Sequence, residues 1–243
     1  EQFGFTFKKG LGQNFLTARN ILEEIVDAAE IESGVIEVGP GFGVLTSELA
    51  QNSDKVVTIE IDERLIDVLD YTLAEYDNVK IINEDILKLD LKKVIDDEFK
   101  GEKVSIAANL PYYITTPIIT KLLEEKLPIK NIVVMVQKEV AERMSAKPST
   151  KDYGAITVLC QYYTEPSIVA NVPASLFVPP PKVDSAVLKL KVLDKPSVEV
   201  KDEGVFFRVV KAAFSQRRKT LLNCLSANFA IPKDEISTLL ESI

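Results

Sequence analysis

The sequence of 243 residues contains no histidine. This absence excludes Ser-His-Asp triads, histidine general bases and histidine-ligated metal sites. The two cysteines, Cys160 and Cys224, stand far apart and form no CxxC pair, so neither a disulfide framework nor a thiolate metal site is indicated. We therefore expect a protein that works without a metal ion, in a reducing compartment.

Long apolar runs are also missing. No stretch reaches the roughly 18 consecutive apolar residues of a membrane-spanning helix, and the first residues are polar or charged, unlike the apolar core of a signal peptide. These absences predict a cytoplasmic protein with no membrane partner. The chain is 46% hydrophobic and 27% charged, and it is long enough for one α/β domain and a small second one.

An overall positive charge is absent as well. The formal net charge of −8 argues at first against a nucleic-acid partner. The charges are unevenly distributed, however, because residues 1–181 carry 18 basic and 29 acidic side chains (net −11), whereas residues 182–243 carry 11 and 8 (net +3). From Gly204 to Lys233 there are six basic residues and no acidic one. An acidic partner would therefore be bound by the C-terminal part.

Short apolar runs alternate with helical patterns through most of the chain, which is typical of a doubly wound α/β sheet. Seven strands are expected, over residues 35–38, 55–61, 79–82, 104–108, 131–137, 166–172 and 185–192. Residues 193–203 read as a polar linker, and only helical patterning follows. The sequence therefore predicts a sheet domain over residues 1–193 and a small helical domain over residues 194–243.

A glycine-rich turn, Gly39-Pro40-Gly41-Phe42-Gly43, follows the first expected strand and precedes a helix from about Val44. Strand, glycine turn and helix form the nucleotide-binding opening of a doubly wound fold. The spacing departs from the dinucleotide fingerprint, which has its third glycine where Val44 stands. Glycines let a ligand approach the backbone closely, but this turn alone is weak evidence.

Acidic residues follow the second and third strands. Glu60 and Asp62 end the second strand, where an acid reaches ribose hydroxyls in this topology. Asp62 also suits the cap of the next helix, so Glu60 is the better candidate for the ribose. Asp85, after the third strand, could accept a hydrogen bond from an adenine amino group or could simply start a turn.

The tetrapeptide Asn109-Leu110-Pro111-Tyr112 follows the fourth strand, which Pro111 terminates. The Asn109 side-chain carbonyl and the Leu110 backbone carbonyl could each accept a hydrogen bond from one exocyclic amine. Tyr112 offers a flat face on which the ring carrying that amine could stack. A plain turn would explain the tetrapeptide by itself. Together with the glycine turn and the acids at the preceding strand ends, it describes an S-adenosylmethionine methyltransferase.

The sequence resembles the KsgA-type ribosomal RNA adenine N6,N6-dimethyltransferases. The matching stretches cover nearly the whole chain: Gly12–Leu16, Glu37–Gly41, Glu60–Asp62, Glu84-Asp85, Asn109–Pro117, Phe177–Ser185 and Phe214–Leu221. The resemblance implies an α/β fold, namely a doubly wound, seven-stranded, Rossmann-like methyltransferase sheet with a small helical C-terminal domain. It further implies S-adenosylmethionine as cofactor and two adjacent adenines, in the hairpin loop near the 3′ end of small-subunit rRNA, as substrate. Relatives usually continue into further helix, which leaves open whether the C-terminal domain is complete.

The resemblance also implies roles for single residues. Those expected to bind the cofactor are Gln13, Asn14, Leu16, Gly39, Gly41, Glu60, Asp85 and Asn109. Those expected to hold the target adenine are Asn109, Leu110, Pro111 and Tyr112, with Phe177 packing on the other face of the base.

The basic C-terminal segment is the expected RNA-binding region. On a helical wheel Arg208, Lys211, Arg218 and Lys219 share a face, whereas Arg217 falls on the apolar side, which predicts a break in the helix near Ser215-Gln216. All five basic residues are expected to bind RNA phosphates.

Two other functions remain open. One is a large-subunit rRNA adenine N6-methyltransferase of the antibiotic-resistance type, and the other is a non-catalytic RNA-binding assembly factor that keeps the fold. A non-catalytic protein would be expected to lose Asn109 or Glu60, and both are present. The expected partner is small-subunit rRNA or a precursor of the small ribosomal subunit, bound by a monomer with a role in ribosome biogenesis.

Overall fold

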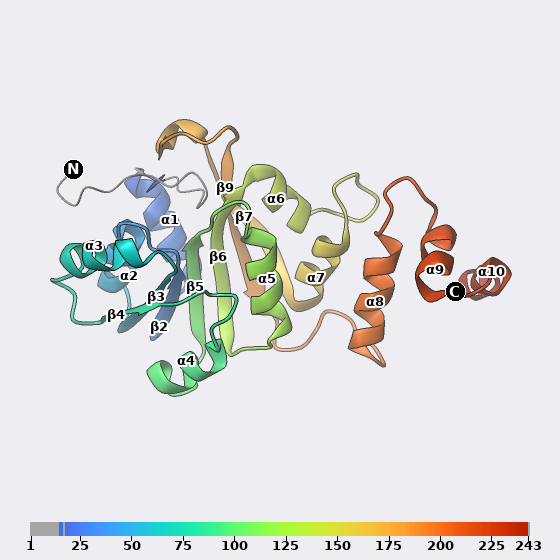
Figure 1. Ribbon diagram of the computed structural model, residues 1–243, viewed down its shortest axis with the longest axis horizontal. Helices are drawn as coiled ribbons and strands as arrows, with labels where there is room; N and C mark the ends of the chain where they lie inside the picture. Colours follow the sequence, from blue (N-terminus) through green and yellow to red (C-terminus); the bar gives the residue numbers. More distant parts are fainter. Residues whose placement is uncertain (1–14, 17, 243) are drawn as a thin grey trace.

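The computed structural model describes residues 15, 16 and 18–242. A seven-stranded sheet forms the centre of the molecule, in the order β4-β3-β2-β5-β6-β9-β7 (Figure 1). The strands are β2 (Gly34–Val38), β3 (Lys55–Glu60), β4 (Val79–Asn83), β5 (Val104–Asn109), β6 (Ile129–Gln137), β7 (Thr164–Val172) and β9 (Ser185–Val192). The first five are parallel, and β9 runs antiparallel to both β6 and β7. The predicted seven-stranded sheet is therefore confirmed.

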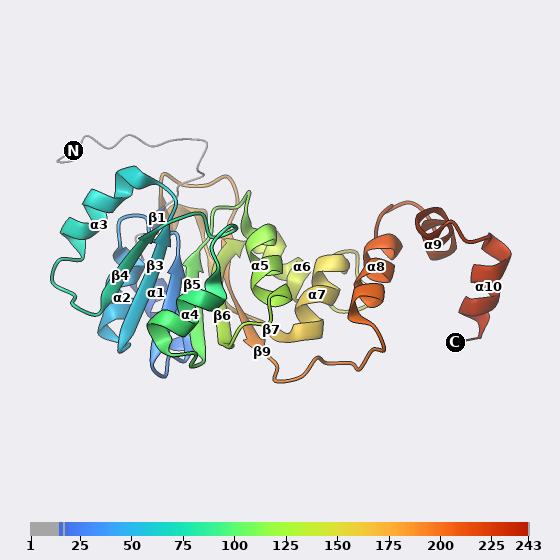
Figure 2. The ribbon, with the colours of Figure 1, turned by 60° about the horizontal axis from the view of Figure 1, so that its bottom comes forward.

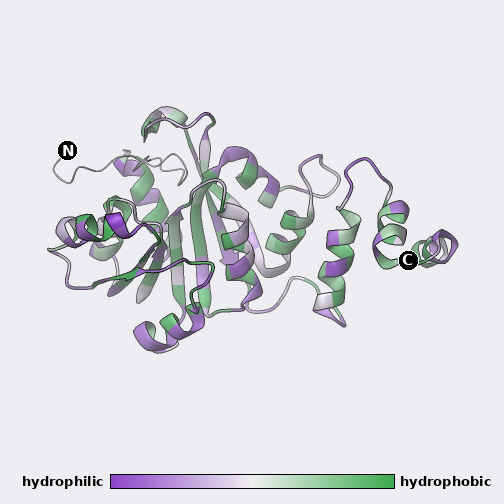
Figure 3. Cartoon of the chain, viewed as in Figure 1, coloured by the Kyte–Doolittle hydropathy of each residue, from purple (hydrophilic) through white to green (hydrophobic). Residues whose placement is uncertain are grey.

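Helices cover both faces of the sheet (Figure 2). They are α1 (Arg19–Ala29), α2 (Val44–Gln51), α3 (Ile66–Thr72), α4 (Leu91–Phe99), α5 (Thr115–Glu124), α6 (Lys138–Met144) and α7 (Ala155–Tyr163). Because side chains alternate along a strand, Ile36 of β2 joins one buried cluster and Val35 joins the other. The strands are accordingly apolar in continuous runs, as parallel strands buried on both faces are (Figure 3). Each fully buried Ile or Val stabilises the fold by about 1.5–3 kcal/mol.

The strand order reverses between β2 and β5. From β2 the chain moves outward to β3 and β4, and it then returns to β5 and moves the other way to β6. Loops on the two sides of such a switch point diverge, which leaves a crevice beyond the carboxyl ends of the strands. The turn after β2 and the Asn109 end of β5 flank this crevice.

A short strand pair joins the N-terminal region to the loop before β9. Strand β1 (Phe15–Leu16) pairs antiparallel with β8 (Phe177–Val178), with Leu16 opposite Phe177. Leu16 is thereby brought to the same edge of the sheet as the crevice. Gln13 and Asn14, both expected to bind the cofactor, lie outside the described residues.

Three helices extend from the sheet domain at its β7 end: α8 (Glu203–Ala213), α9 (Leu221–Phe229) and α10 (Lys233–Glu241) (Figures 1 and 2). Helix α8 packs on α7 through aromatic rings, because the Tyr162 ring centroid lies 5.2 Å from those of Phe206 and Phe207. The Asp202 carboxylate caps α8 by accepting a hydrogen bond from the Val205 amide at 2.8 Å.

The predicted break after α8 is confirmed, since the helix ends at Ala213 and a turn spans residues 214–220. The shared helical face predicted for Arg208, Lys211, Arg218 and Lys219 is wrong for the last two. Arg218 and Lys219 lie in the turn, because the chain leaves the helix one turn before it reaches them.

Within the part of the chain that the structure describes, no helix is both long and apolar enough to cross a membrane. The same residues contain no group of three or more His, Cys, Asp or Glu side chains placed to hold a metal ion.

Candidate active site

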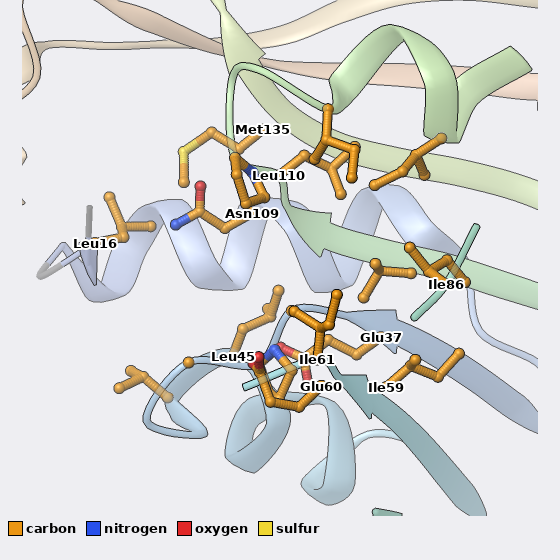
Figure 4. A pocket seen from close by; sticks show the side chains of 18 of the residues that line it. Leu16, Glu37, Leu45, Ile59, Glu60, Ile61, Ile86, Asn109, Leu110 and Met135 are labelled. Atoms are coloured by element: carbon orange, nitrogen blue, oxygen red, sulfur yellow. The ribbon is translucent and has the colours of Figure 1, made fainter. Parts of the chain in front are cut away.

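A cavity lies in the crevice beyond β2, β3 and β5 (Figure 4). Asn109 and Met135 lie on one side of it, and Glu60 and Ile61 lie on the other. Its wall includes many of the residues predicted from the sequence to bind a ligand: Leu16, Gly39, Gly41, Glu60, Asp85, Asn109, Leu110, Pro111 and Tyr112. Residues from five separate stretches of sequence thus converge on one site.

The glycine turn forms the floor of this cavity. Gly39, Gly41 and Gly43 have φ angles of +71°, +60° and +83°, a region that favours glycine. A Cβ atom on Gly39 would meet no atom within 4 Å, so the space beside this backbone is open to a ligand. At Gly43 a Cβ atom would lie 3.1 Å from the Leu73 side chain, at the end of α3. The glycine therefore lets the start of α2 pack closely against α3.

The two acids after β3 have different roles. Glu60 is buried in the cavity wall, and its carboxylate accepts a hydrogen bond from the Asp62 amide at 2.7 Å. A carboxylate has about four acceptor positions, so capacity remains for ligand hydroxyls. Asp62 instead caps the following turn and accepts a hydrogen bond from Arg64 Nε at 2.8 Å. The structure thus makes Glu60 the acid that can accept from a ligand, whereas Asp62 serves as the cap of the turn.

Asp85 combines the two alternatives that the sequence left open. It starts a turn, because its Oδ1 accepts a hydrogen bond from the Leu87 amide at 3.0 Å. The same residue also lines the cavity. Its carboxylate therefore has a fixed position in the cavity wall, where it can accept a hydrogen bond from an amino group.

Glu37 is a cavity residue that was not among those predicted. It lies inside β2, is 1% exposed, and accepts a hydrogen bond from the Thr46 hydroxyl at 2.5 Å. Its pKa is raised to about 8, mainly by burial and also by the neighbouring Glu60, whereas the Thr46 hydroxyl opposes the shift. A charged residue inside an otherwise apolar strand was the signal that could have identified it.

The raised pKa of Glu37 predicts a pH dependence of stability. Between the ordinary pKa of 4.5 and about 8, the folded protein keeps a proton that the unfolded chain has lost, so stability falls as the pH rises through this window. Glu37→Gln should remove this loss, which amounts to at most about 1.4 kcal/mol per pH unit. Denaturant unfolding at pH 5, 6.5 and 8 measures the effect, with the exposed Glu75→Gln as control. Parallel pH profiles for wild type and Glu37→Gln would contradict the assignment.

Asn109 and Leu110 occupy the end of β5. Asn109 is half-buried, and its side-chain amide points into the cavity on the side of Leu16 (Figure 4). The Leu110 amide donates to the Met135 carbonyl at 3.2 Å. The Leu110 carbonyl accepts no hydrogen bond from residues 15–16 or 18–242, although the residue is 1% exposed. A buried carbonyl without a partner is uncommon, and a ligand donor would satisfy it.

Tyr112 is held in position by a residue that lies far away in the sequence. Pro111 begins a turn in which its carbonyl accepts a hydrogen bond from the Ile114 amide at 3.1 Å. This turn directs the Tyr112 hydroxyl to the hydroxyl of Ser185, at 2.8 Å. Burial raises the pKa of Tyr112, so the hydroxyl stays protonated and can donate. Ser185 is fully buried at the start of β9, so the Tyr112 ring is anchored to the sheet.

Among the described residues predicted to hold the cofactor or the adenine, Phe177 is the one that the structure does not bring to the cavity wall. Its ring is 2% exposed and packs in the buried cluster that also contains Leu16. Leu16, its partner across the β1–β8 pair, does line the cavity. Phe177 therefore lies behind the wall, and contact with a bound base would require the loop before β9 to shift.

The predicted RNA-binding residues lie apart from the cavity. Arg208 and Lys211 are exposed on α8, and Lys211 Nζ lies 3.9 Å from a carboxylate oxygen of Glu124. Arg217, Arg218 and Lys219 are exposed in the turn between α8 and α9. The structure thus keeps the acidic cavity and the basic C-terminal residues on separate elements.

The cavity suits S-adenosylmethionine. Glu60 can accept from ribose hydroxyls, Asp85 can accept from an amino group, and the open space at Gly39 admits a ligand against the backbone. Apolar side chains between these groups, such as Ile61 and Ile86, provide flat contacts for a purine ring (Figure 4). Asn109 lies across the cavity from Glu60, and Tyr112 also lines the wall (Figure 4).

Comparison with known proteins agrees with this geometry. A model of the ribosomal RNA adenine dimethylase family matches residues 4–239. The chain is 57% identical over 239 residues to "Ribosomal RNA small subunit methyltransferase A" of Bacillus mycoides (strain KBAB4), covering 97% of this chain and 82% of the relative.

Two solved structures are also similar. A dimethyladenosine transferase from Plasmodium falciparum is 34% identical, with a TM-score of 0.71 over 87% of this chain and 74% of that one. The 23S rRNA methyltransferase ErmE is 29% identical, with a TM-score of 0.71 over 93% and 88%. The chain therefore belongs to the ribosomal RNA adenine dimethylase family, whose members are methyltransferases that use S-adenosylmethionine.

Proposed function

We propose that this protein transfers methyl groups from S-adenosylmethionine to the N6 atoms of two adjacent adenines in the 3′-terminal hairpin loop of small-subunit rRNA. The observation that carries the proposal is the pair of acceptors at the end of β5. The cavity wall contains the Asn109 side chain, the Leu110 carbonyl, which has no hydrogen-bond partner among the described residues, and Tyr112. Two acceptors beside an aromatic face suit a planar base with an exocyclic amino group.

The residues of the site activate this amino group by accepting hydrogen bonds from its two N–H groups. The lone pair of adenine N6 is delocalised into the ring, so the amine is a poor nucleophile. When Asn109 and Leu110 each accept one N–H, the nitrogen is favoured in a pyramidal geometry with a localised lone pair. Bound S-adenosylmethionine supplies an already activated methyl group. In-line positioning by the protein can then contribute much of the rate.

A strong base is not required by this mechanism. The nitrogen becomes acidic once it is methylated, so its proton can pass to water. This agrees with a chain that has no histidine. The base must leave its stack to enter the site, which costs a few kcal/mol and least in a loop. Stacking on Tyr112 offsets this by about 1–3 kcal/mol, and Phe177 would add to it if the loop before β9 moves.

The test of the function is methylation of ribosomal subunits with labelled S-adenosylmethionine. Small and large subunits lacking the modification should be offered separately, and the labelled nucleotides mapped. Dimethylated adenines in the 3′-terminal hairpin of the small-subunit RNA are expected. Label confined to the large subunit would support an antibiotic-resistance type of enzyme instead, and no label on either RNA would support a non-catalytic assembly factor.

We also propose a division of labour along the chain. Residues 1–193 carry out the chemistry, and the helices of residues 194–243 bind rRNA phosphates. The substrate is naked rRNA or a precursor of the small subunit in the cytoplasm, and the enzyme acts as a monomer during ribosome biogenesis. The charge asymmetry supports this division, because an acidic catalytic part needs a separate basic surface to hold RNA.

Glu60→Gln should weaken S-adenosylmethionine binding by about 1.5–3 kcal/mol, the usual contribution of hydrogen bonds to a charged group. Glutamine keeps one acceptor oxygen, whereas the carboxylate can serve both ribose hydroxyls. Calorimetry on the purified protein measures the affinity. Asp62→Asn is the matched control, because Asp62 caps a turn and should affect stability alone. Unchanged affinity in Glu60→Gln, or a larger loss in Asp62→Asn, would refute this role.

The hydrogen bond between Tyr112 and Ser185 predicts matching defects. Tyr112→Phe and Ser185→Ala each remove it while leaving an aromatic ring in place, so each should lower kcat by about 2- to 10-fold, corresponding to a net 0.5–1.5 kcal/mol. The double variant should be no slower than either single one. Steady-state kinetics would show kcat falling while the KM for S-adenosylmethionine stays constant. Additive losses would mean that the two hydroxyls act separately.

A further inference from the structure

Two basic loops from different parts of the chain lie next to each other. The α6–α7 loop, residues 145–154, carries Lys147 and Lys151. The α8–α9 turn, residues 214–220, carries the basic run 217–219. In Figure 1 both lie at the upper edge of the molecule, beyond the end of the sheet where β6 gives way to α6.

An aromatic contact joins the two loops. The ring centroids of Tyr153 and Phe214 lie 6.1 Å apart with an interplanar angle of 56°. Tyr153 stands near the end of the α6–α7 loop, and Phe214 is the first residue of the α8–α9 turn. A tilted pair at this distance is a favourable arrangement for aromatic rings. The contact therefore fixes a loop of the sheet domain beside a turn of the C-terminal helices.

The cations on these loops lack acidic partners. Among the described residues, Lys147, Lys151 and the run 217–219 form no ion pair, and Asp152 is the one acid within the two loops. At the opposite edge of the sheet, by contrast, two lysines have close acidic partners. Lys103 Nζ lies 2.7 Å from Asp194, and Lys130 Nζ lies 2.7 Å from Glu32. The two loops together thus present five cations that form no ion pair among the described residues.

The loops are connected to the active site through short structural links. Asn109 pairs with Met135 on β6, and α6 begins immediately after that strand. The Lys138 amide at the start of α6 donates to the Asp184 carbonyl, in the loop before β9, at 3.0 Å. Helix α6 has seven residues and is about 10 Å long, so the basic loops lie a few nucleotides away from a base held at Asn109.

We propose that the α6–α7 loop and the α8–α9 turn form one continuous phosphate-binding surface for the RNA strand that flanks the target adenines. This rests on the proposed function and assigns part of RNA binding to the sheet domain itself. Lysine and arginine side chains bind phosphates without reading bases. The surface therefore sets the position of the RNA, and the base is selected at Asn109. After Phe214 the turn is hydrophilic, as a solvated phosphate-binding element requires (Figure 3).

The first experiment measures RNA affinity across a salt series. The probe is a hairpin with the sequence of the 3′ end of small-subunit rRNA. Lys147→Ala/Lys151→Ala should lower the slope of log K against log salt by about 1.5 units if each lysine meets one phosphate, and should weaken binding roughly tenfold at 0.15 M salt. The control pair is Lys93→Ala/Lys195→Ala, from α4 and the linker at the opposite edge of the sheet (Figure 1), and it should leave the slope unchanged.

The second experiment tests whether the loops act as one surface. Tyr153→Ala and Phe214→Ala should each weaken RNA binding about 3- to 10-fold without removing a charge, and the double variant should lose no more than either single one. Tyr153→Phe keeps the ring and should bind like wild type. Melting temperature and S-adenosylmethionine affinity are measured in parallel to show that each variant is folded.

The outcomes separate this inference from the proposed function. One outcome is that the RNA affinity of wild type falls steeply with salt, while Lys147→Ala/Lys151→Ala has the same slope of log K against log salt as the control pair. This result would overturn the phosphate-binding surface and leave the proposed function standing. If Tyr153→Ala weakens binding and Phe214→Ala does not, Tyr153 contacts RNA directly and the single surface is overturned. If wild type neither binds nor methylates small-subunit rRNA, the proposed function itself fails.

Discussion

Replacement of Asn109 by alanine is expected to slow methyl transfer by at least two orders of magnitude while leaving the melting temperature close to that of wild type. The side chain lies at the end of β5, in the wall of the cavity, and carries one of the two acceptors that we propose hold the amine. A hundredfold loss corresponds to about 2.7 kcal/mol of transition-state stabilisation. The fold should be retained, because β5 is stabilised mainly by the buried side chains that precede Asn109.

Single-turnover methylation of small subunits measures this effect, because it separates the chemical step from product release. The matched control is Asn171→Ala, an exposed asparagine on β7 at the far edge of the sheet, which should react at the wild-type rate. Near-normal turnover in Asn109→Ala would remove the catalytic role from the end of β5. A large fall in melting temperature would show that the residue is structural.

The triple variant Arg217→Ala/Arg218→Ala/Lys219→Ala is expected to lower the salt slope of RNA binding by about two to three units. The acidic sheet domain repels RNA within a Debye length of about 8 Å at physiological salt, so attraction must come from local basic patches. All three side chains are exposed in the turn and distant from the cofactor cavity. S-adenosylmethionine affinity should therefore remain unchanged.

RNA affinity of wild type and the triple variant, measured from low to high salt, provides the test, with calorimetry of the cofactor as the control. Equal slopes for the two proteins would place the RNA elsewhere. A variant that also loses S-adenosylmethionine would indicate that the turn supports the fold of the sheet domain.

Much of the fold and site was predictable because backbone geometry imposes it locally. Short apolar runs between helical patterns identified the strands, and the turn residues after β2 and β5 marked the carboxyl ends of these two strands. In a parallel sheet these ends meet at one edge, so Gly39, Glu60 and Asn109 could be assigned to one cavity without knowledge of distances.

What could not be predicted depends on contacts between segments far apart in sequence. The Tyr112–Ser185 hydrogen bond joins residues 73 positions apart, and no local pattern indicates it. The burial of Phe177 follows from the pairing of β1 with β8, which involves only two residues on each side. The helical wheel failed for Arg218 and Lys219 because a wheel assumes a continuous helix, whereas α8 ends at Ala213.

The uneven packing of the C-terminal helices has a consequence for the energetics of substrate binding. Helix α8 is stacked on α7 through four aromatic rings, but α9 and α10 contribute one buried side chain each, Cys224 and Ile236. A segment with so little buried apolar surface opens locally at much lower free energy than the sheet. With RNA bound to these helices as we propose, part of the binding free energy goes into holding α9 and α10 in place. The proposed RNA-binding role therefore couples the affinity for rRNA to the local stability of these two helices, independently of the charges that they present.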